Sequence, residues 1–385
     1  MMTLSAIKAD VGSVGGHTRP TDDMMETVRR TVASSGLVID FTITHTGDDI
    51  AIIMSHEHGV AAPAIHNMCW QAFEAAAAVA KSHGLYGAGQ DLLKDAPAGN
   101  LRGSGPGVAE LSFNLNLTKE SHRPAESFLV IAGDKCGPGA FNLPLFLTFS
   151  DPMHCGGLLL SPKIHQGYTF VIEDMDHVEE DTRRIISLHS PEDNWDIATL
   201  LRNIDRYGVL AVYSRAHPEE QAAAASTDRL HNITGKYQGK DDPICIVRNQ
   251  GIFPASEEVV EPYRMTPLVT GDARGSHTMP LMPMAMNSAV SGFYCHPIVT
   301  AVGFSMNEKG HFSTYCHDFF GDPAWDLVRQ QSQERAIWIR SQGFFGVAMA
   351  SQEEIAYTGL KDSEERLSKR FEHRPETAPL VPVGS

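Results

Sequence analysis

The chain has 385 residues and a hydrophobic content of 42%, enough to bury a substantial core in one large domain or two ordinary ones. Its formal net charge of −16, from 31 basic and 47 acidic side chains, argues against nucleic acid as a partner. The six cysteines show no CxxC spacing, which is typical of free thiols in a reducing compartment. Without a signal-peptide pattern or an apolar run long enough to span a bilayer, the sequence predicts a cytoplasmic protein.

Predicted strands and helices alternate along the first part of the chain. Residues 3–9 have the pattern of a strand, and residues 21–35 have that of a helix with apolar side chains on one face. A second, alanine-rich helix is predicted over residues 63–83. Between the helices, alternating apolar residues on both sides of Gly47 and the Asp48-Asp49 pair predict a hairpin with the carboxylates at its tip.

The rest of the chain continues this mixture. Helices are predicted to begin at Ser190-Pro191-Glu192-Asp193 and at Asp322-Pro323, because a capping residue followed by proline favours a helix start. Further strand-like runs are expected over residues 128–132, 158–160, 168–173, 208–213, 244–248 and 299–305. The residues therefore indicate a mixed α and β fold. The proline-rich segment 372–385 is expected to be a disordered tail, which leaves residues 1–371 as the folded part.

Carboxylates recur at the predicted strand ends, next to glycines. Asp10 follows the first strand, and the loop after it leads to His17; Asp134-Lys135 and Gln90-Asp91 lie in similar places. Loops at strand ends can gather ligands over a rigid scaffold. Each residue alone has a more ordinary interpretation, as a turn former, a helix cap or a loop histidine. Together they point to a shared metal site.

The segment Lys236-Tyr237-Gln238-Gly239-Lys240-Asp241-Asp242-Pro243 combines carbonyl chemistry with metal chemistry. A neutral lysine amine can form a Schiff base with a carbonyl, but two bare aspartates would keep Lys240 protonated. Cations bound to Asp241 and Asp242 would reverse that local field, and Tyr237 would then be placed to move protons beside the carbonyl. The ordinary alternative is a surface ion pair between Lys240 and Asp241.

Several segments together resemble one enzyme family, the bifunctional fructose 1,6-bisphosphate aldolase/phosphatase, which is the archaeal-type, class V fructose-1,6-bisphosphatase of gluconeogenesis. The resemblance runs from the N-terminus to about residue 360. Besides the lysine segment, it is carried by Ile7–Asp10 with Gly16-His17, Thr44–Asp49, Leu85–Leu93, Gly103–Gly107, Pro138–Pro144 and Arg274–Pro283.

The resemblance implies a role for each matching residue. Lys240 would be the Schiff-base lysine and Tyr237 the catalytic tyrosine. The magnesium ligands would be Asp10, His17, Asp48, Asp49, Gln90, Asp134, Asp241 and Asp242. The substrate contacts would be His17, Tyr86, Gly99, Asn100, Lys135, Gln250, Arg274 and Tyr357. Carboxylates with one amide and one imidazole suit several Mg²⁺ ions rather than zinc.

Two stretches depart from the family pattern. Where relatives carry an acidic residue after an aromatic one, this chain reads Phe293-Tyr294-Cys295-His296-Pro297, so a contact to a sugar hydroxyl is expected to be lost or replaced. The motif Arg-Gly-Ser-His-x-Gly-Pro becomes Arg274-Gly275-Ser276-His277-Thr278-Met279-Pro280, which removes a loop glycine. Neither change touches an expected metal ligand, so the departures bear on substrate details.

The resemblance also implies a fold and an assembly. It implies a single domain of four layers, with helices outside two sheets, and a homo-octamer in which Tyr357 completes a neighbour's active site. Sugar phosphates would be the substrates, and neither nucleic acid nor a membrane is an expected partner.

Three functions are consistent with the residues. The first is the bifunctional enzyme, which condenses dihydroxyacetone phosphate with glyceraldehyde 3-phosphate and then removes the 1-phosphate to give fructose 6-phosphate. The second is a metal-dependent fructose-1,6-bisphosphatase without aldolase activity, against which the presence of both Lys240 and Tyr237 argues. The third is a non-catalytic metal- or phosphate-binding regulator, which would have little reason to keep a complete ligand set.

Overall fold

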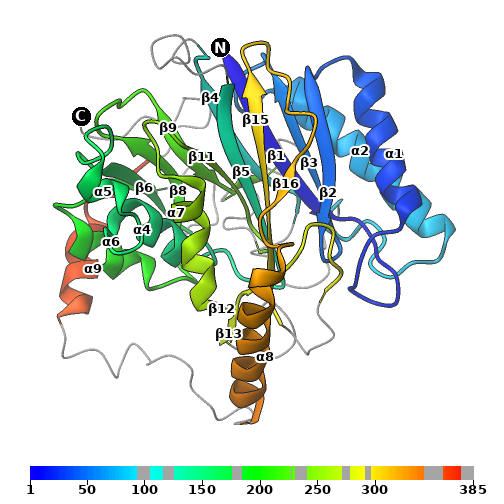
Figure 1. Ribbon diagram of the computed structural model, residues 1–385. Helices are drawn as coiled ribbons and strands as arrows, with labels where there is room; N and C mark the ends of the chain where they lie inside the picture. Colours follow the sequence, from blue (N-terminus) through cyan, green and yellow to red (C-terminus); the bar gives the residue numbers. More distant parts are fainter. Residues whose placement is uncertain are drawn as a thin grey trace.

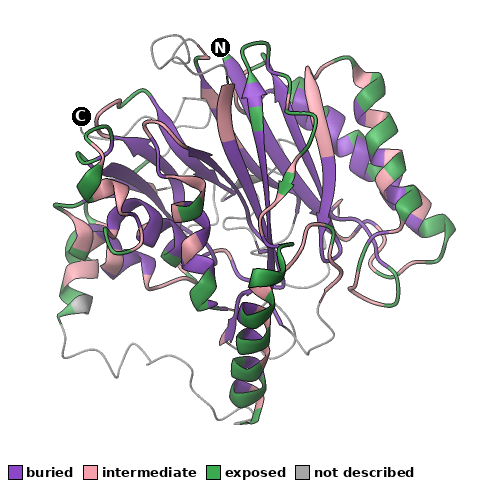
Figure 2. Cartoon of the chain, viewed as in Figure 1, coloured by how far each residue is buried: buried purple, intermediate pink, exposed green. Residues whose placement is uncertain are grey.

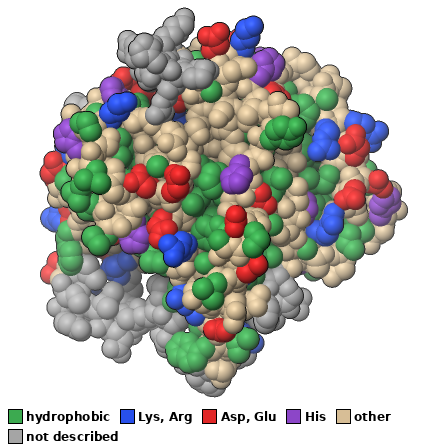
Figure 3. Space-filling model, viewed as in Figure 1, with side chains coloured by type: hydrophobic (Ala, Val, Ile, Leu, Met, Phe, Trp, Pro, Cys, Tyr) green, Lys and Arg blue, Asp and Glu red, His purple; other side chains and the backbone are tan. Residues whose placement is uncertain are grey.

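The structure is a computed structural model (Figure 1), which describes residues 1–92, 105–115, 125–175, 184–226, 228–229, 241–270, 278–290, 296–341 and 359–373. Helices and β-sheets are both present, which confirms the predicted mixed α and β fold. Within the described ranges, no helix combines the length and the apolarity needed to cross a membrane. On the face shown in Figure 3, basic side chains are scattered among acidic ones.

Two large sheets form the centre of the molecule (Figure 1). The first has the strand order β10 (Asp228–Arg229), β4 (Gly107–Phe113), β1 (Met2–Asp10), β3 (Asp49–His56), β2 (Asp40–Thr46). The second has the order β14 (Met282–Pro283), β15 (Ile298–Asn307), β5 (Ala125–Asp134), β11 (Ile244–Asn249), β9 (Gln221–Ala225), β8 (Tyr207–Ser214), β6 (Tyr168–Asp174), β7 (Arg184–His189), β17 (Glu372–His373). Strand β16 (His317–Asp318) pairs with β15, and β12 (Leu268–Thr270) pairs with β13 (Thr278–Pro280).

The two sheets pack face to face, because alternate residues of their strands are apolar on the inner side. Leu4 and Ile53 of the first sheet share one buried cluster with Val130 and Phe304 of the second. In Figure 2 the strands at the centre of the molecule are mostly purple, that is, buried.

Helices cover the outer face of each sheet. Helices α1 (Asp22–Ser35) and α2 (Pro63–Ser82) pack on the first sheet, where Val28 and Phe73 join Ile7 and Ile52 in a second core. The second sheet is covered in the same way by α4 (Asn142–Ser150), α6 (Asn194–Leu201), α7 (Ser256–Val260) and α9 (Leu360–Ser368). The layers therefore run helix, sheet, sheet, helix, as the resemblance implied.

Most predicted elements form close to their expected bounds. Helix α1 begins where Thr21 accepts a hydrogen bond from the backbone of Met24, and it ends at Gly36 in the left-handed conformation. Residues 322–341 form a short 3₁₀ turn, Pro323–Trp325, followed by α8 (Asp326–Ser341). The predicted hairpin is present, with β2 and β3 joined at Gly47-Asp48.

Two expectations about elements were wrong, and some strands were not expected. Residues 158–160 lie in a short helix, α5 (Gly157–Leu160), whose Leu159 and Leu160 are exposed; a short apolar run does not by itself distinguish strand from helix. Helix α6 begins at Asn194 rather than at Pro191, because Asp193 accepts a hydrogen bond from the His189 backbone and closes a turn first. Strand β7 was not predicted at all.

The proline-rich segment begins inside a strand. Glu372 and His373 form β17, which pairs with β7 at the edge of the second sheet. Residues 374–385 lie outside the described ranges.

Candidate active site

Carboxylates from both sheets meet at one end of the sandwich. Asp10 ends β1 and lies directly opposite Asp49, which begins β3. Asp134 ends β5 in the second sheet, and Asp242 lies just before β11, the neighbour of β5. The strand ends therefore bring together side chains that are more than two hundred residues apart in sequence.

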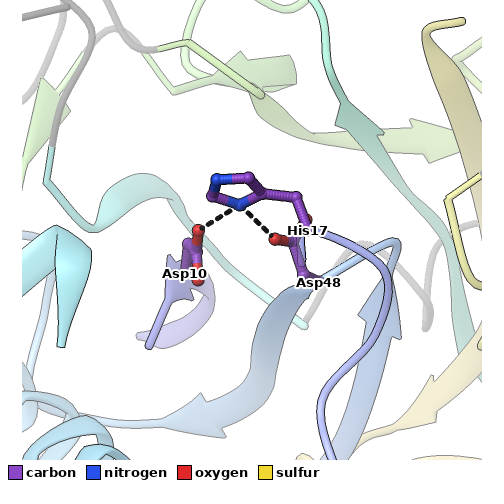
Figure 4. Close-up of side chains that lie close together, drawn as sticks. All are labelled: Asp10, His17 and Asp48. Atoms are coloured by element: carbon purple, nitrogen blue, oxygen red, sulfur yellow. Dashed lines mark hydrogen bonds and ion pairs between the residues drawn. The ribbon is translucent and has the colours of Figure 1, made fainter. Parts of the chain in front are cut away.

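The first group consists of Asp10, His17 and Asp48 (Figure 4). The Nδ1 atom of His17 lies 2.8 Å from Oδ2 of Asp48 and 3.5 Å from Oδ2 of Asp10. Hydrogen bonds to Asp10 and Asp48 raise the pKa of His17 to about 10. Burial raises the pKa of Asp10 to about 6. The first group thus carries buried negative charge that a lone imidazole balances only in part.

The second group consists of Asp49, Asp134 and Asp242, all buried. Asp242 is held in place because its Oδ1 accepts from the Cys136 backbone N–H at 3.0 Å, while its own N–H donates to the Cys136 carbonyl at 2.7 Å. Burial, with other carboxylates nearby, raises the pKa of Asp134 well above its ordinary value. The raised pKa thus reflects mainly the burial of this group.

Lys135 connects the two groups. Its Nζ atom donates to Oδ1 of Asp48 at 2.7 Å and to Oδ1 of Asp134 at 2.8 Å. Although burial alone would raise it, Lys135 and His17 hold the pKa of Asp48 well below its ordinary value. The two groups therefore form one continuous site, built around an ammonium.

The comparisons with known proteins agree with this geometry. A family model described as fructose-1,6-bisphosphatase matches residues 1–372. The chain belongs to this family. A fructose-1,6-bisphosphate aldolase/phosphatase of Thermus thermophilus is 48% identical over 372 residues, which cover 96% of this chain and 99% of that protein.

Two further relatives carry the same name. The fructose-1,6-bisphosphate aldolase/phosphatase of Cenarchaeum symbiosum is 45% identical over 356 residues, covering 92% of this chain and 90% of that protein. That of Moorella thermoacetica is 41% identical over 384 residues, covering 99% of this chain and 97% of its own length. The similarity thus extends over almost the whole chain.

The donor set fits the divalent metal dependence of a fructose-1,6-bisphosphatase. The described site offers carboxylate oxygens and one imidazole. The side chains of Gln90 and His17 both lie close to Gly87. Asp241 is buried next to Asp242. Oxygen-rich donors of this kind favour hard divalent cations over zinc or copper.

The other expected site residues do not belong to either carboxylate group. The exposed Tyr86 packs against the edge of the His17 ring, with ring centroids 4.8 Å apart. Gln250 follows the far end of β11, where Asn249 pairs with Ser127, so the fold of one chain does not bring it to the carboxylates. The residues Tyr237, Lys240, Gly99, Asn100, Arg274 and Tyr357 lie outside the described ranges.

The segment Phe293–Pro297, which departs from the family pattern, contains one residue with a clear structural contact. Most of that stretch lies outside the described residues, but His296 itself is buried, and its Nε2 lies 2.9 Å from the Ser332 hydroxyl of α8. In this chain, therefore, His296 links the segment before β15 to helix α8.

Two further residues shape the site: Asp91, which the sequence grouped with the strand-end carboxylates without a role of its own, and Lys8, which sequence reasoning missed. Asp91 accepts hydrogen bonds from the backbone of Asp10 at 2.9 Å and of Gly105 at 3.1 Å, and so fixes the end of β1. Lys8 contacts Asp49 from inside the sandwich. The strand period contained the signal for Lys8, because it places a lysine on the same face as Leu4 and Ala6.

Proposed function

We propose that this chain is a bifunctional gluconeogenic enzyme. It would condense dihydroxyacetone phosphate with glyceraldehyde 3-phosphate to fructose 1,6-bisphosphate, and then hydrolyse the 1-phosphate to give fructose 6-phosphate. The observation that carries the proposal is the convergence of two carboxylate groups around Lys135, in a chain whose near full-length relatives are named for both activities.

For the phosphatase step we propose Mg²⁺ as the metal. On one side of Lys135, ions would be held by Asp10, His17, Asp48 and Gln90. On the other side, they would be held by the second group together with Asp241. Bound Mg²⁺ would supply charge neutralisation and an activated water. The water oxygen attacks phosphorus, the bond from phosphorus to the C1 oxygen breaks, and that oxygen takes up a proton. Lys135 and Arg274 would bind phosphate, the first as a point charge and the second as a bidentate fork.

For the condensation we propose Lys240 as the nucleophile. Its amine adds to the ketone carbon of dihydroxyacetone phosphate, and loss of water leaves a Schiff base. A proton then leaves the adjacent carbon, which attacks the aldehyde carbon of glyceraldehyde 3-phosphate; hydrolysis of the Schiff base releases the bisphosphate. Tyr237 would accept that proton and donate one to the new hydroxyl.

The test measures both activities in one magnesium buffer, on the wild type and on Lys240→Arg. Arginine keeps the charge but removes an amine that can lose its proton near neutral pH. Condensation should fall by several orders of magnitude while phosphatase activity stays measurable. Borohydride with dihydroxyacetone phosphate should trap a covalent adduct on Lys240 in the wild type. Normal condensation by the variant would exclude Lys240 as the Schiff-base residue.

The second candidate, a fructose-1,6-bisphosphatase without aldolase activity, predicts a different result. It expects no condensation and no trapped adduct even in the wild type.

We further propose that the chain works in the cytoplasm as a homo-octamer. Support for the location comes from the described cysteines, which are free thiols. An octamer in which a neighbouring chain adds residues would explain how Gln250, at the far end of β11, could serve a site it does not reach within its own chain. Light scattering of the purified protein measures the mass of the assembly directly.

A further inference from the structure

Lys8 occupies a position where a lysine is rarely found. Alternate residues of β1 face the second sheet, and on this inner side Leu4 and Ala6 belong to the cluster between the sheets. Lys8 is next in the same row, and its exposure is 0%. Lysine is almost never fully buried unless it is paired, so the partners of its ammonium indicate what the residue does.

The ammonium of Lys8 connects the two sheets at the candidate active site. Its Nζ atom contacts the carboxylate of Asp49, which begins β3 in the same sheet, and it donates to the carbonyl oxygen of Gly133 at 2.7 Å. Gly133 belongs to β5 of the second sheet and immediately precedes Asp134. One side chain thus fixes the positions of two strand ends, each of which contributes a carboxylate to the second group.

The charges around Lys8 are those of the second group. The Lys8 ammonium interacts electrostatically with the carboxylates of Asp49, Asp242 and Asp134. Lys135 also donates to Asp134, at 2.8 Å, so Lys8 is one of two ammonium groups that offset the charge of these carboxylates.

We propose that Lys8 is a positioning residue for the reaction: a buried ammonium that holds the second group together and limits its affinity for divalent ions. The inference rests on the proposed use of that group as a metal site. Because a cation close to a metal site repels the incoming ion in a medium of low dielectric constant, Lys8 weakens metal binding while it prevents the carboxylates from pushing one another apart. Ions would then exchange during turnover rather than remain locked in place.

The test compares metal binding by the wild type with that by Lys8→Met and Lys8→Gln. Both variants remove the charge; methionine keeps the bulk, and glutamine also keeps a donor for Gly133. Binding of Mn²⁺ alone is measured by calorimetric titration, and melting temperatures are measured in EDTA and in excess Mn²⁺. We expect at least about tenfold tighter binding at one class of sites, a lower melting temperature in EDTA, and a larger upward shift on adding Mn²⁺.

The control is Arg248→Met. Arg248 is also fully buried, and it pairs with Glu220 between the rings of Phe113 and Phe253, but it lies toward the far end of β11, opposite Phe128. This variant should lose stability by a similar mechanism, with Mn²⁺ affinity unchanged. Lys8→Arg, which keeps the charge, should also bind Mn²⁺ like the wild type.

Unchanged or weaker Mn²⁺ binding by both neutral Lys8 variants would overturn the inference and leave Lys8 with a purely structural role. If Lys8→Met is unfolded in EDTA, Lys8→Gln, which keeps a donor for Gly133, provides the comparison of affinities. A wild type that binds no divalent ion would instead refute the proposed function, so the two failures are distinguishable.

Discussion

At the scale of single residues, the site depends on one glycine. Gly47 has a φ of 57°, in the left-handed region that favours glycine, and a Cβ added there would overlap the carboxylate of Asp134. The backbone N–H of Asp48 also lies 3.4 Å from that carboxylate. The tip of the hairpin therefore approaches β5 more closely than any side chain at position 47 would permit.

Gly47→Ala should separate Asp134 from the hairpin and lower both metal affinity and phosphatase activity. Gly36→Ala is a matched control, because Gly36 has a φ of 65° but nothing within 4 Å of an added Cβ. The control should lose about 1 kcal/mol of unfolding free energy from backbone strain alone and keep its activity. Chemical denaturation and fructose 1,6-bisphosphate hydrolysis measure the two effects; equal losses in both variants would rule out the steric explanation.

Asp49→Asn should lower phosphatase turnover at least about a hundredfold, with little change in the far-ultraviolet circular dichroism spectrum. Asparagine keeps the size of the side chain but removes a charged oxygen from the second group. Hydrolysis of fructose 1,6-bisphosphate at saturating magnesium is the measurement. Wild-type turnover in this variant would remove Asp49 from the site.

At the scale of elements, a buried polar cluster attaches α2 to the first sheet, away from the candidate active site. Glu110 of β4 accepts hydrogen bonds from the Ser5 hydroxyl of β1 and from the Ala61 backbone, each at 2.6 Å, and its carboxylate lies 3.4 Å from His66 Nε2 of α2. Although burial alone would raise it, these partners hold the pKa of Glu110 below its ordinary value.

Glu110→Gln should therefore lower the free energy of unfolding by about 2 kcal/mol, since hydrogen bonds to a charged acceptor are lost. Mn²⁺ affinity should stay at the wild-type level, because Glu110 pairs with Ser5 in the middle of β1, whereas Asp10 lies at its end. Urea unfolding and calorimetric titration on the same preparation check both statements. A changed Mn²⁺ affinity would show that the cluster and the site are coupled through β1.

The comparison of elements with the sequence shows what local patterns can predict. The β2–β3 hairpin was predictable because alternation and a Gly-Asp turn agree with each other, and this placed Asp48 and Asp49 correctly. The meeting of Asp49 with Asp134 was not, because it depends on how two sheets stack. The family resemblance supplied both residues, whereas Lys8, a single charge in an apolar row, carries meaning only once the facing sheet is known.

At the scale of the whole molecule, stability should depend on pH through buried histidines. Burial lowers the pKa of His56 to about 4, and it lowers that of His296 to about 4 as well. Below about pH 6.5, the unfolded chain binds protons that the folded chain does not accept until about pH 4. The contribution of each of these two histidines to the free energy of unfolding should therefore fall as the pH drops through this window, by up to about 3 kcal/mol. Protonation of Asp10, whose pKa is raised to about 6, has the opposite sign, so the comparison with a histidine variant isolates the histidine term.

Urea unfolding in EDTA at pH 7.5, 6 and 5 measures this dependence. His296→Gln should show a shallower decline than the wild type, since one of the two groups is gone. His83→Gln changes an exposed histidine and should keep the wild-type slope. Identical slopes in all three proteins would exclude His296 as a source of the dependence.

The pairing of Asp10 opposite Asp49 has a consequence for assembly. A slip of one residue between β1 and β3 would turn Asp10 and Lys8 toward the helices and break up both carboxylate groups. Only correctly registered chains then offer a complete set of ligands, so divalent ions in a refolding buffer favour those chains by mass action. The cations proposed for catalysis would therefore also favour, during folding, the molecules in which both sheets have the correct register.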